Sequence, residues 1–320
     1  MNIDKITLSL MLSLSMGHVV NASLVGTLPE KAEWLIQSIG ESNKILRGKK
    51  KYEAPLMLGR MIFYGPPGNG KSTMAATIAQ RGDAKLFKIH GPSIVGKYLG
   101  QAAATIDEIF SDACAHADRY DQVSVIVIDE IDAIAGNNTS ELRSEHNSAL
   151  QKLWLMLDEY KDNHRIYVIC TTNNFEQLHQ AFIDRFGSNC IEVGNPDVQM
   201  RQNVLQHYFN IHAKKCVHTA ILEMLAKKTD GLSIRSLEDL ARDASLAARM
   251  QNEGVVTSAI AKKTLDDIAK KKKAQNKDSY MSLATWRNVV ALCNDVTHTA
   301  RNICFLYGIY TLGSASLSYA

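Results

Sequence analysis

Short apolar runs rich in β-branched residues alternate with longer amphipathic segments over the first two thirds of the chain. Runs of the first kind predict strands, and apolar positions spaced by three or four residues predict helices. The predicted strands lie at residues 60–64, 85–90, 123–129, 165–172 and 190–194. The predicted helices between them lie at residues 71–81, 104–118 and 148–161. Because strands that alternate with helices and are apolar throughout form parallel sheets covered on both faces, we expect an α/β domain.

Beyond Pro196 the strand-like runs stop and only helical patterns remain. These patterns lie at residues 197–215, 218–229, 233–250 and 255–273, separated by short turn-forming stretches. We therefore predict four parts in the chain. They are an apolar leader at 1–22, an α/β domain at 23–196, a small all-helical domain at 197–273 and a C-terminal helical and apolar extension at 274–320.

The composition is that of an ordinary globular protein. The chain has 320 residues, 46% of them hydrophobic and 22% charged, and a formal net charge of +3. That charge is too small to indicate a nucleic-acid partner, although Lys270–Lys273 form a local basic run. The six cysteines lack a CxxC pair, so neither a zinc site nor a disulfide framework is indicated. We expect reduced thiols, with Cys114 and Cys170 buried because both lie in apolar runs.

Both ends of the chain leave membrane contact open. Residues 6–22 resemble the core of a signal peptide, but Asp4 beside Lys5 weakens the basic region that should precede it. An exported or anchoring segment and an amphipathic or disordered leader are therefore both retained. Residues 302–320 carry no charge over a length that could nearly span a bilayer. Their serines and glycines favour a packed segment over an anchor.

The stretch GPPGNGKST stands between the first predicted strand and the first predicted helix, and it matches the pattern GxxxxGK[ST]. Its glycines let backbone N–H groups turn toward phosphates, the helix N-terminus attracts negative charge, and Lys71 adds a positive charge. The hydroxyl of Ser72 would hold Mg²⁺. A glycine–proline turn without a ligand is the alternative, and the flanking strand and helix favour a phosphate site. The predicted nucleotide-binding residues are Gly65, Pro66, Pro67, Gly68, Asn69, Gly70, Lys71, Ser72 and Thr73.

A pair of carboxylates follows the most apolar predicted strand. Asp129 and Glu130 stand at the end of VSVIVID, where they can face a phosphate-binding loop on a neighbouring strand. Asp129 would hold Mg²⁺, and Glu130 would orient and polarise the attacking water. Asp132 could belong to a segment that simply leaves the core for solvent. The two motifs together predict a site that binds and hydrolyses a nucleotide with Mg²⁺.

Five stretches of the sequence together resemble the AAA family of the AAA+ ATPases, over residues 24–250. In chain order they are GPPGNGKS, LFKIHGPSIVGKYLGQ, VIVIDEIDAIAG, VICTTNN and DRF. The resemblance implies a P-loop NTPase fold, in which a parallel sheet sandwiched by helices is followed by a small all-α lid domain. It also implies ATP and Mg²⁺ as cofactors and a homo-hexameric ring with ATP at each subunit interface.

The resemblance further implies roles for two polar residues after the fourth strand. Asn173 matches the residue that senses the γ-phosphate and helps to place the water, with Asn174 the less favoured candidate. Arg185 matches the arginine finger that reaches into the neighbouring subunit's site and neutralises charge on the transferred phosphoryl group. The alternative for Arg185 is a surface arginine paired with Asp184.

Further implied residues lie at the start of the domain and in the lid. Val25 and Gly26 would line the adenine pocket. Arg235 would contact the γ-phosphate, although ordinary solvation of its helix is an equal alternative.

The stretch GKYLGQ resembles the loop that lines the central channel of such rings. Lys97, Tyr98 and Leu99 would grip an extended polypeptide, mainly through the aromatic ring, and a buried core tyrosine is the alternative. The polar residues 137–147 would form a second loop facing the channel.

We therefore predict an ATPase that couples hydrolysis to the remodelling, unfolding or disassembly of protein substrates. A clamp-loader or initiator-like ATPase acting on nucleic acid, and a nucleotide-dependent binding switch, are the alternatives. Because the activity consumes ATP, a cytoplasmic or other ATP-bearing compartment is expected, with membrane association possible through either terminus.

Overall fold

The computed structural model describes residues 28–48, 59–95, 101–136, 143–161, 163–251, 254–268 and 270. The chain divides into two units, Met1–Val256 and Thr257–Ala320. This division falls inside the range 197–273 expected for the helical domain, whose predicted end therefore stays a prediction. Both terminal segments for which membrane contact was left open, 6–22 and 302–320, lie outside the described residues. Within the described ranges, no helix is at once long and apolar enough to cross a bilayer.

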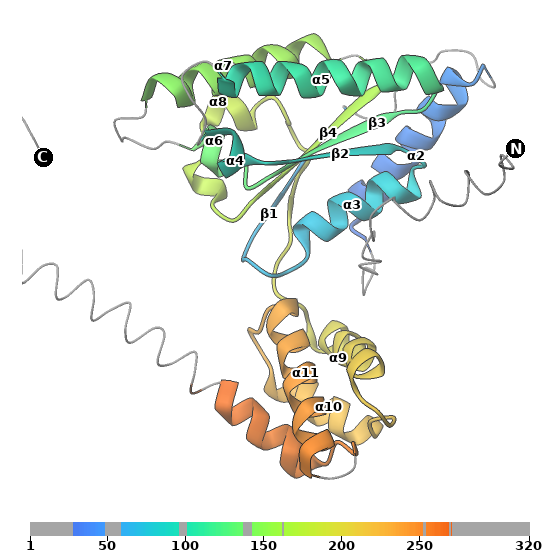
Figure 1. The fold of residues 1–320 in the computed structure, drawn as a ribbon, viewed down its shortest axis with the longest axis vertical. Helices are drawn as coiled ribbons and strands as arrows, with labels where there is room; N and C mark the ends of the chain where they lie inside the picture. The colour runs from blue at the N-terminus through green and yellow to red at the C-terminus, as the bar shows by residue number, and fades with distance from the viewer. Residues whose placement is uncertain are drawn as a thin grey trace, which may run out of the picture. The chain divides into compact units, whose positions relative to one another are not determined.

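Five parallel strands form one sheet with the order β2-β3-β4-β1-β5 (Figure 1). In that order they are β2 (Lys85–His90), β3 (Ser124–Asp129), β4 (Ile166–Thr172), β1 (Arg60–Tyr64) and β5 (Cys190–Glu192). Each overlaps one of the five predicted strands. The predicted α/β fold with a parallel sheet between helices is confirmed.

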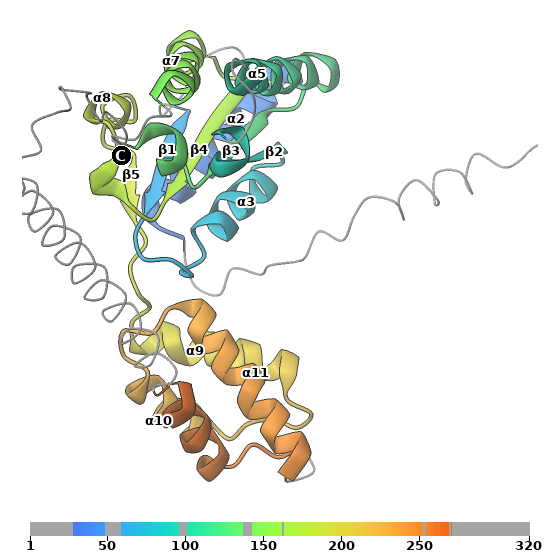
Figure 2. The same cartoon turned by 60° about the vertical axis from the view of Figure 1, so that its left-hand side comes forward.

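Helices cover both faces of this sheet (Figures 1 and 2). The helices on one face are α2 (Glu30–Leu46) and α3 (Lys71–Arg81), and those on the other include α5 (Gln101–Tyr120) and α7 (Arg143–Glu159). Successive side chains of a strand point to opposite faces, so Met61 and Phe63 pack with α2 and α3 whereas Ile62 packs with α5 and α7. Burial on both faces explains why the strands are apolar at nearly every position.

Short helical turns follow the carboxyl ends of three strands. They are α4 (Gly91–Val95) after β2, α6 (Asp132–Ala135) after β3, and η1 (Phe175–Gln177) with α8 (Gln180–Ile183) after β4. The predicted polar loop 137–147 is wrong in its second half, because α7 begins at Arg143. A polar helical turn resembles a loop in sequence, which accounts for the error.

The described residues between β5 and residue 251 form the helices α9 (Val198–His212), α10 (Thr219–Lys228) and α11 (Ile234–Gln251). The side chain of Asp197 caps α9 by accepting a hydrogen bond from the backbone N–H of Met200 at 2.7 Å. The buried guanidinium of Arg201 donates to the carbonyl oxygen of Ala226 at 2.8 Å and pairs with Asp230 at 2.9 Å. This side chain therefore joins α9 to the end of α10. Residues 258–268, in the second unit, are also helical.

The cysteines among the described residues are free thiols. Cys170 on β4 is fully buried, and burial raises the pKa of its thiol. The expected burial of Cys114 is met only in part, because this side chain on α5 is partly buried against the core and lies beside Asp118.

Asn43 on α2 joins the end of α3 to the start of β3, and so links the elements that carry the two sequence motifs. Its buried amide nitrogen donates to the carbonyl oxygens of Gly82 and Asp83 at 2.9 and 3.0 Å. Its amide oxygen accepts from the backbone N–H of Val123 at 2.8 Å. All three partners belong to backbone that must stay in place for the loop before α3 to face the end of β3.

Replacing Asn43 with alanine should lower the free energy of unfolding by about 2–3 kcal/mol, because the buried carbonyl of Gly82 and the buried N–H of Val123 lose their partner. Chemical denaturation would measure the change. The control is Asn203→Ala on the exposed face of α9, expected to cost less than about 0.5 kcal/mol. Equal stability of the two variants would contradict the assignment.

Candidate functional site

The loop between β1 and α3 needs glycine at particular positions. Gly65 has φ 135°, and a Cβ there would lie 2.5 Å from the carbonyl oxygen of Val193. Gly70 has φ 81° and precedes the first residue of α3, whose N-terminus has no side-chain cap. An uncapped helix N-terminus beside such a loop is suited to bind an anion.

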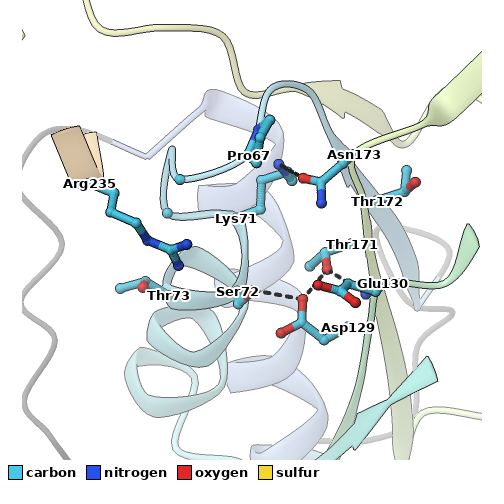
Figure 3. Close-up of a pocket in the computed structure, with 12 residues that line it drawn as sticks. Pro67, Lys71, Ser72, Thr73, Asp129, Glu130, Thr171, Thr172, Asn173 and Arg235 are labelled. Carbon is cyan, nitrogen blue, oxygen red and sulfur yellow. Dashed lines mark hydrogen bonds between the residues drawn. The ribbon is translucent and has the colours of Figure 1, made fainter. Parts of the chain in front are cut away.

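A cavity of about 230 Å³ opens above this loop at the carboxyl ends of the strands (Figure 3). Ends of parallel strands are where open α/β sheets place their ligands. The residues that line the cavity are Pro67, Gly68, Gly70, Lys71, Ser72, Thr73, Asp129, Glu130, Thr171, Thr172, Asn173 and Arg235. Most of the predicted nucleotide-site residues thus lie around one space.

Lys71 is the buried cation of the cavity. Its ammonium donates to the carbonyl oxygens of Gly65 and Pro66 at 2.7 and 2.9 Å, and to Oδ1 of Asn173 at 2.7 Å. Burial lowers the pKa of Lys71, although the charges of Asp129 and Asp132 act in the opposite direction. The Lys71–Asn173 bond brings the side chain at the end of β4 to the phosphate-binding loop (Figure 3).

Asp129, the last residue of β3, accepts hydrogen bonds from two hydroxyl groups. Oγ of Ser72 lies 2.7 Å from its Oδ1, and Oγ1 of Thr171 donates to the same oxygen. The ammonium of Lys88 lies 3.3 Å from Oδ2. Burial raises the pKa of Asp129, but the bonds from Thr171 and Ser72 and the charge of Lys88 outweigh it and leave that pKa below its usual value. Asp129 is therefore a carboxylate at neutral pH.

The Ser72 hydroxyl and the Asp129 carboxylate fit a magnesium ion. Both are hard oxygen donors, and they lie within 2.7 Å of each other beside the loop. Mg²⁺ in nucleotide sites is held by few protein oxygens, together with phosphates and water. This donor set matches the predicted roles of Ser72 and Asp129.

Glu130 follows in a strained backbone conformation, with φ 55°. Its N–H donates to Oγ1 of Thr171 at 3.3 Å, and its carboxylate Oε2 lies 3.6 Å from Nε2 of His90. A Cβ at Gly91 would lie 2.3 Å from the carbonyl oxygen of Glu130, so glycine is required after β2. The left-handed conformation costs about 1–3 kcal/mol and is typical of functional positions.

Sequence reasoning missed several residues around the acidic pair. Thr171 and Thr172 line the cavity, and Lys88 and His90 lie next to Asp129 and Glu130. The two threonines stand directly before the predicted Asn173, so their place at the end of a buried strand could have indicated them. Lys88 and His90 gave no such signal, because their position depends on the pairing of β2 with β3.

Asp132 is bonded to β4, which contradicts a segment that only leaves for solvent. Its carboxylate accepts from Oγ1 of Thr172 at 2.7 Å and from the amide of Asn174 at 3.3 Å. Asn174 thus faces Asp132, whereas Asn173 faces Lys71.

Three predicted residues of the loop do not line the cavity. The carbonyl groups of Gly65 and Pro66 accept from Lys71, as described above. Asn69 is buried and directs its side chain elsewhere: its amide donates to Oδ1 of Asn195 at 2.9 Å and its oxygen accepts from the N–H of Ile234 at 3.3 Å.

Arg235, the second residue of α11, lines the cavity. Its backbone N–H also donates to the carbonyl oxygen of Gly68 at 3.0 Å. Figure 3 shows its guanidinium on the same side of the cavity as Thr73.

Arg185, after α8, does not line this cavity. Its guanidinium pairs with Asp158 at 2.8 Å, donates to the carbonyl oxygen of Ala181 at 2.7 Å and lies 5.0 Å from the centre of the Trp154 ring. The alternative pairing with Asp184 is wrong, because Asp184 accepts from Gln180 and the partner of Arg185 is on α7.

Five other predicted site residues lie outside the described residues. They are Val25, Gly26, Lys97, Tyr98 and Leu99. Their roles stay predictions.

Comparisons with known proteins place the α/β domain among its relatives. Residues 61–192 match the model of the ATPase family associated with various cellular activities (AAA). The chain is 34% identical over 190 residues to ATPase family gene 2 protein of Schizosaccharomyces pombe, covering 59% of this chain and 23% of that protein. It is 31% identical over 188 residues to Cell division protein C of Sulfolobus acidocaldarius, covering 58% and 49%.

A third relative is the ATP-dependent zinc metalloprotease FtsH of Lachnoclostridium phytofermentans, which is 31% identical over 228 residues, covering 69% of this chain and 38% of that protein. The chain thus spans less than half the length of each of these relatives. Its fold and cavity are those of a P-loop nucleotide-binding domain. Within that class, residues 61–192 match the AAA family.

Proposed function

We propose that this chain hydrolyses Mg-ATP in a ring of identical subunits and uses the energy to remodel, unfold or disassemble protein substrates. The observation that carries the proposal is the convergence of Lys71, Ser72, Asp129, Glu130 and Asn173 on one cavity. A bound Mg²⁺ would neutralise negative charge on the phosphate oxygens. Of the two carboxylates that line the cavity, Asp129 is bonded to Ser72 and Thr171, which leaves Glu130 as the candidate base for water.

The residues divide the work of phosphoryl transfer between them. Lys71 and the N-terminus of α3 would bind and orient the phosphates, and Ser72 and Asp129 would hold the metal. Glu130 accepts a proton from the attacking water, and Asn173, held by Lys71, orients that water near the γ-phosphate. Arg185 would act on the cavity of a neighbouring subunit, which is consistent with its place outside its own cavity.

A protein substrate is supported by the sequence GKYLGQ and by the kind of relatives found. One relative is named an ATP-dependent zinc metalloprotease, and this name says that it acts on proteins. The present sequence contains no HExxH motif, so peptide-bond hydrolysis is not part of the proposal.

The test of the proposal is an ATPase assay of the full chain over a range of protein concentrations. Turnover per subunit should rise with concentration as interfaces form, and an unfolded protein such as casein should stimulate it. Stimulation by single-stranded DNA in place of casein would favour a nucleic-acid ATPase. ATP binding without turnover at any concentration would favour a binding switch.

Replacing Tyr98 with alanine should separate hydrolysis from mechanical work. Basal ATPase should persist, because no phosphate contact is predicted for Tyr98, whereas casein stimulation and the unfolding of a tagged test protein should fall by about tenfold as the aromatic grip is lost. Tyr98→Phe is the matched control and should retain most of both. Normal unfolding by the alanine variant would refute the threading role, and a variant that does not fold would identify Tyr98 as a core residue.

A further inference from the structure

Strand β2 at the edge of the sheet brings basic side chains to the acidic end of β3. Its register pairs Lys88 with Val127 and His90 with Asp129. Residues two apart on a strand point to the same face, so Lys88 and His90 share one face. The ammonium of Lys88 lies 3.3 Å from Oδ2 of Asp129.

Both carboxylate oxygens of Asp129 are therefore already in use. Oδ1 accepts from the hydroxyls of Ser72 and Thr171, and Oδ2 is paired with Lys88. The Asp129 side chain is only 16% exposed, so few water molecules can compensate its charge. The negative charge expected to attract Mg²⁺ is thus neutralised in advance by a residue of the chain.

Lys88 is able to leave this position. Its side chain is 52% exposed, and the ammonium is at the end of a flexible four-carbon stem. Lys71, in contrast, is buried and makes three hydrogen bonds around the loop. The two lysines of the site differ accordingly: Lys71 is fixed beside the phosphate position, and Lys88 is a movable counter-charge for the metal ligand.

We propose that Lys88 is a positioning residue that pairs with Asp129 when the site holds no Mg-nucleotide and competes with Mg²⁺ for this carboxylate. Lys88 would thereby set the Mg²⁺ concentration at which the chain binds ATP productively. The inference rests on the proposed role of Asp129 as a metal ligand. Asp129 would then exchange an internal ion pair for a metal contact whenever Mg-ATP enters.

The experiment measures binding of a fluorescent ATP analogue to the full chain while Mg²⁺ is titrated from EDTA-treated buffer. Lys88→Met should lower the Mg²⁺ concentration for half-maximal binding by about two- to fivefold, the effect expected of a half-exposed ion pair. Lys88→Gln should act in the same direction, and Lys88→Arg should stay close to the parent. Binding is the readout, so the result does not depend on turnover.

Lys85→Met is the matched control. Lys85 is on the same strand and exposed, but it pairs in register with Ser124 at the opposite end of β3. Its removal changes the net charge equally and should leave the Mg²⁺ dependence nearly unchanged.

Two different failures can be told apart. An unchanged or increased Mg²⁺ requirement in Lys88→Met that still binds the analogue, or an equal shift in Lys85→Met, overturns the inference alone. A parent protein that binds no ATP analogue at any Mg²⁺ concentration overturns the proposed function, and this inference with it.

Discussion

Glu130→Gln is expected to lower ATP turnover by about 100-fold or more while ATP binding remains, since general-base catalysis contributes roughly 10²–10⁴-fold. The amide keeps the size and shape of the side chain but cannot accept the proton of the attacking water. Glu130 is not among the groups bonded to Lys71 or Ser72, so the phosphate and metal contacts should survive. Turnover by coupled assay and binding of a fluorescent ATP analogue should be measured on the same preparation.

Lys71→Ala is the contrasting variant, and it should lose ATP binding itself. Its ammonium is the buried positive charge beside the phosphate-binding loop, and its removal also frees Asn173. A Glu130→Gln protein with the turnover of the parent would refute the role of Glu130. Loss of binding in both variants would instead mean that Glu130 maintains the structure of the site.

The main elements of the fold could be predicted from sequence because their signals are local. Burial on both faces made strands such as β3 apolar at nearly every position, and the helical period marked α3 with the bounds it has in the structure. The loop of residues 65–70 was equally clear, because closely spaced glycines between a strand and a helix that begins with Lys71 and Ser72 have few alternatives. Each of these features depends on residues close together in the chain.

Other parts of the site depend on contacts that spacing does not encode. Lys88 reaches Asp129 only because β2 pairs with β3, and Arg185 finds Asp158 only because α7 passes beside α8. Asn43 likewise joins segments that are 39 and 80 residues away in the chain. Polar residues at such positions look like ordinary surface residues until the strand order is known.

The placement of Arg185 allows a direct test of catalysis between subunits. In its own subunit this guanidinium pairs with Asp158 and Trp154 on α7 and does not line the cavity. If Arg185 served its own cavity, a neighbouring subunit with an intact Arg185 could not restore the activity of a subunit that lacks it. If it serves a neighbour, two differently damaged subunits can complement each other.

Arg185→Ala should therefore lower turnover by about 10³-fold or more, the effect of losing an arginine finger, while each subunit still binds ATP. The matched control is Arg47→Ala, which removes an exposed arginine paired with Asp83 at 2.8 Å, the distance of the Arg185–Asp158 pair. This variant should keep the turnover of the parent. A loss of activity common to both would point to a general effect of charge.

Mixing Arg185→Ala subunits with Glu130→Gln subunits should restore part of the activity. An Arg185→Ala subunit keeps an intact cavity, and a Glu130→Gln neighbour supplies the missing guanidinium. In a randomly mixed equimolar ring about one interface in four would combine the two intact parts. Turnover should rise well above that of either variant alone and approach about one quarter of the turnover of the parent. Sedimentation should be used to check that the mixture has assembled. Assembled mixtures as inactive as the separate variants would show that Arg185 does not act across a subunit interface.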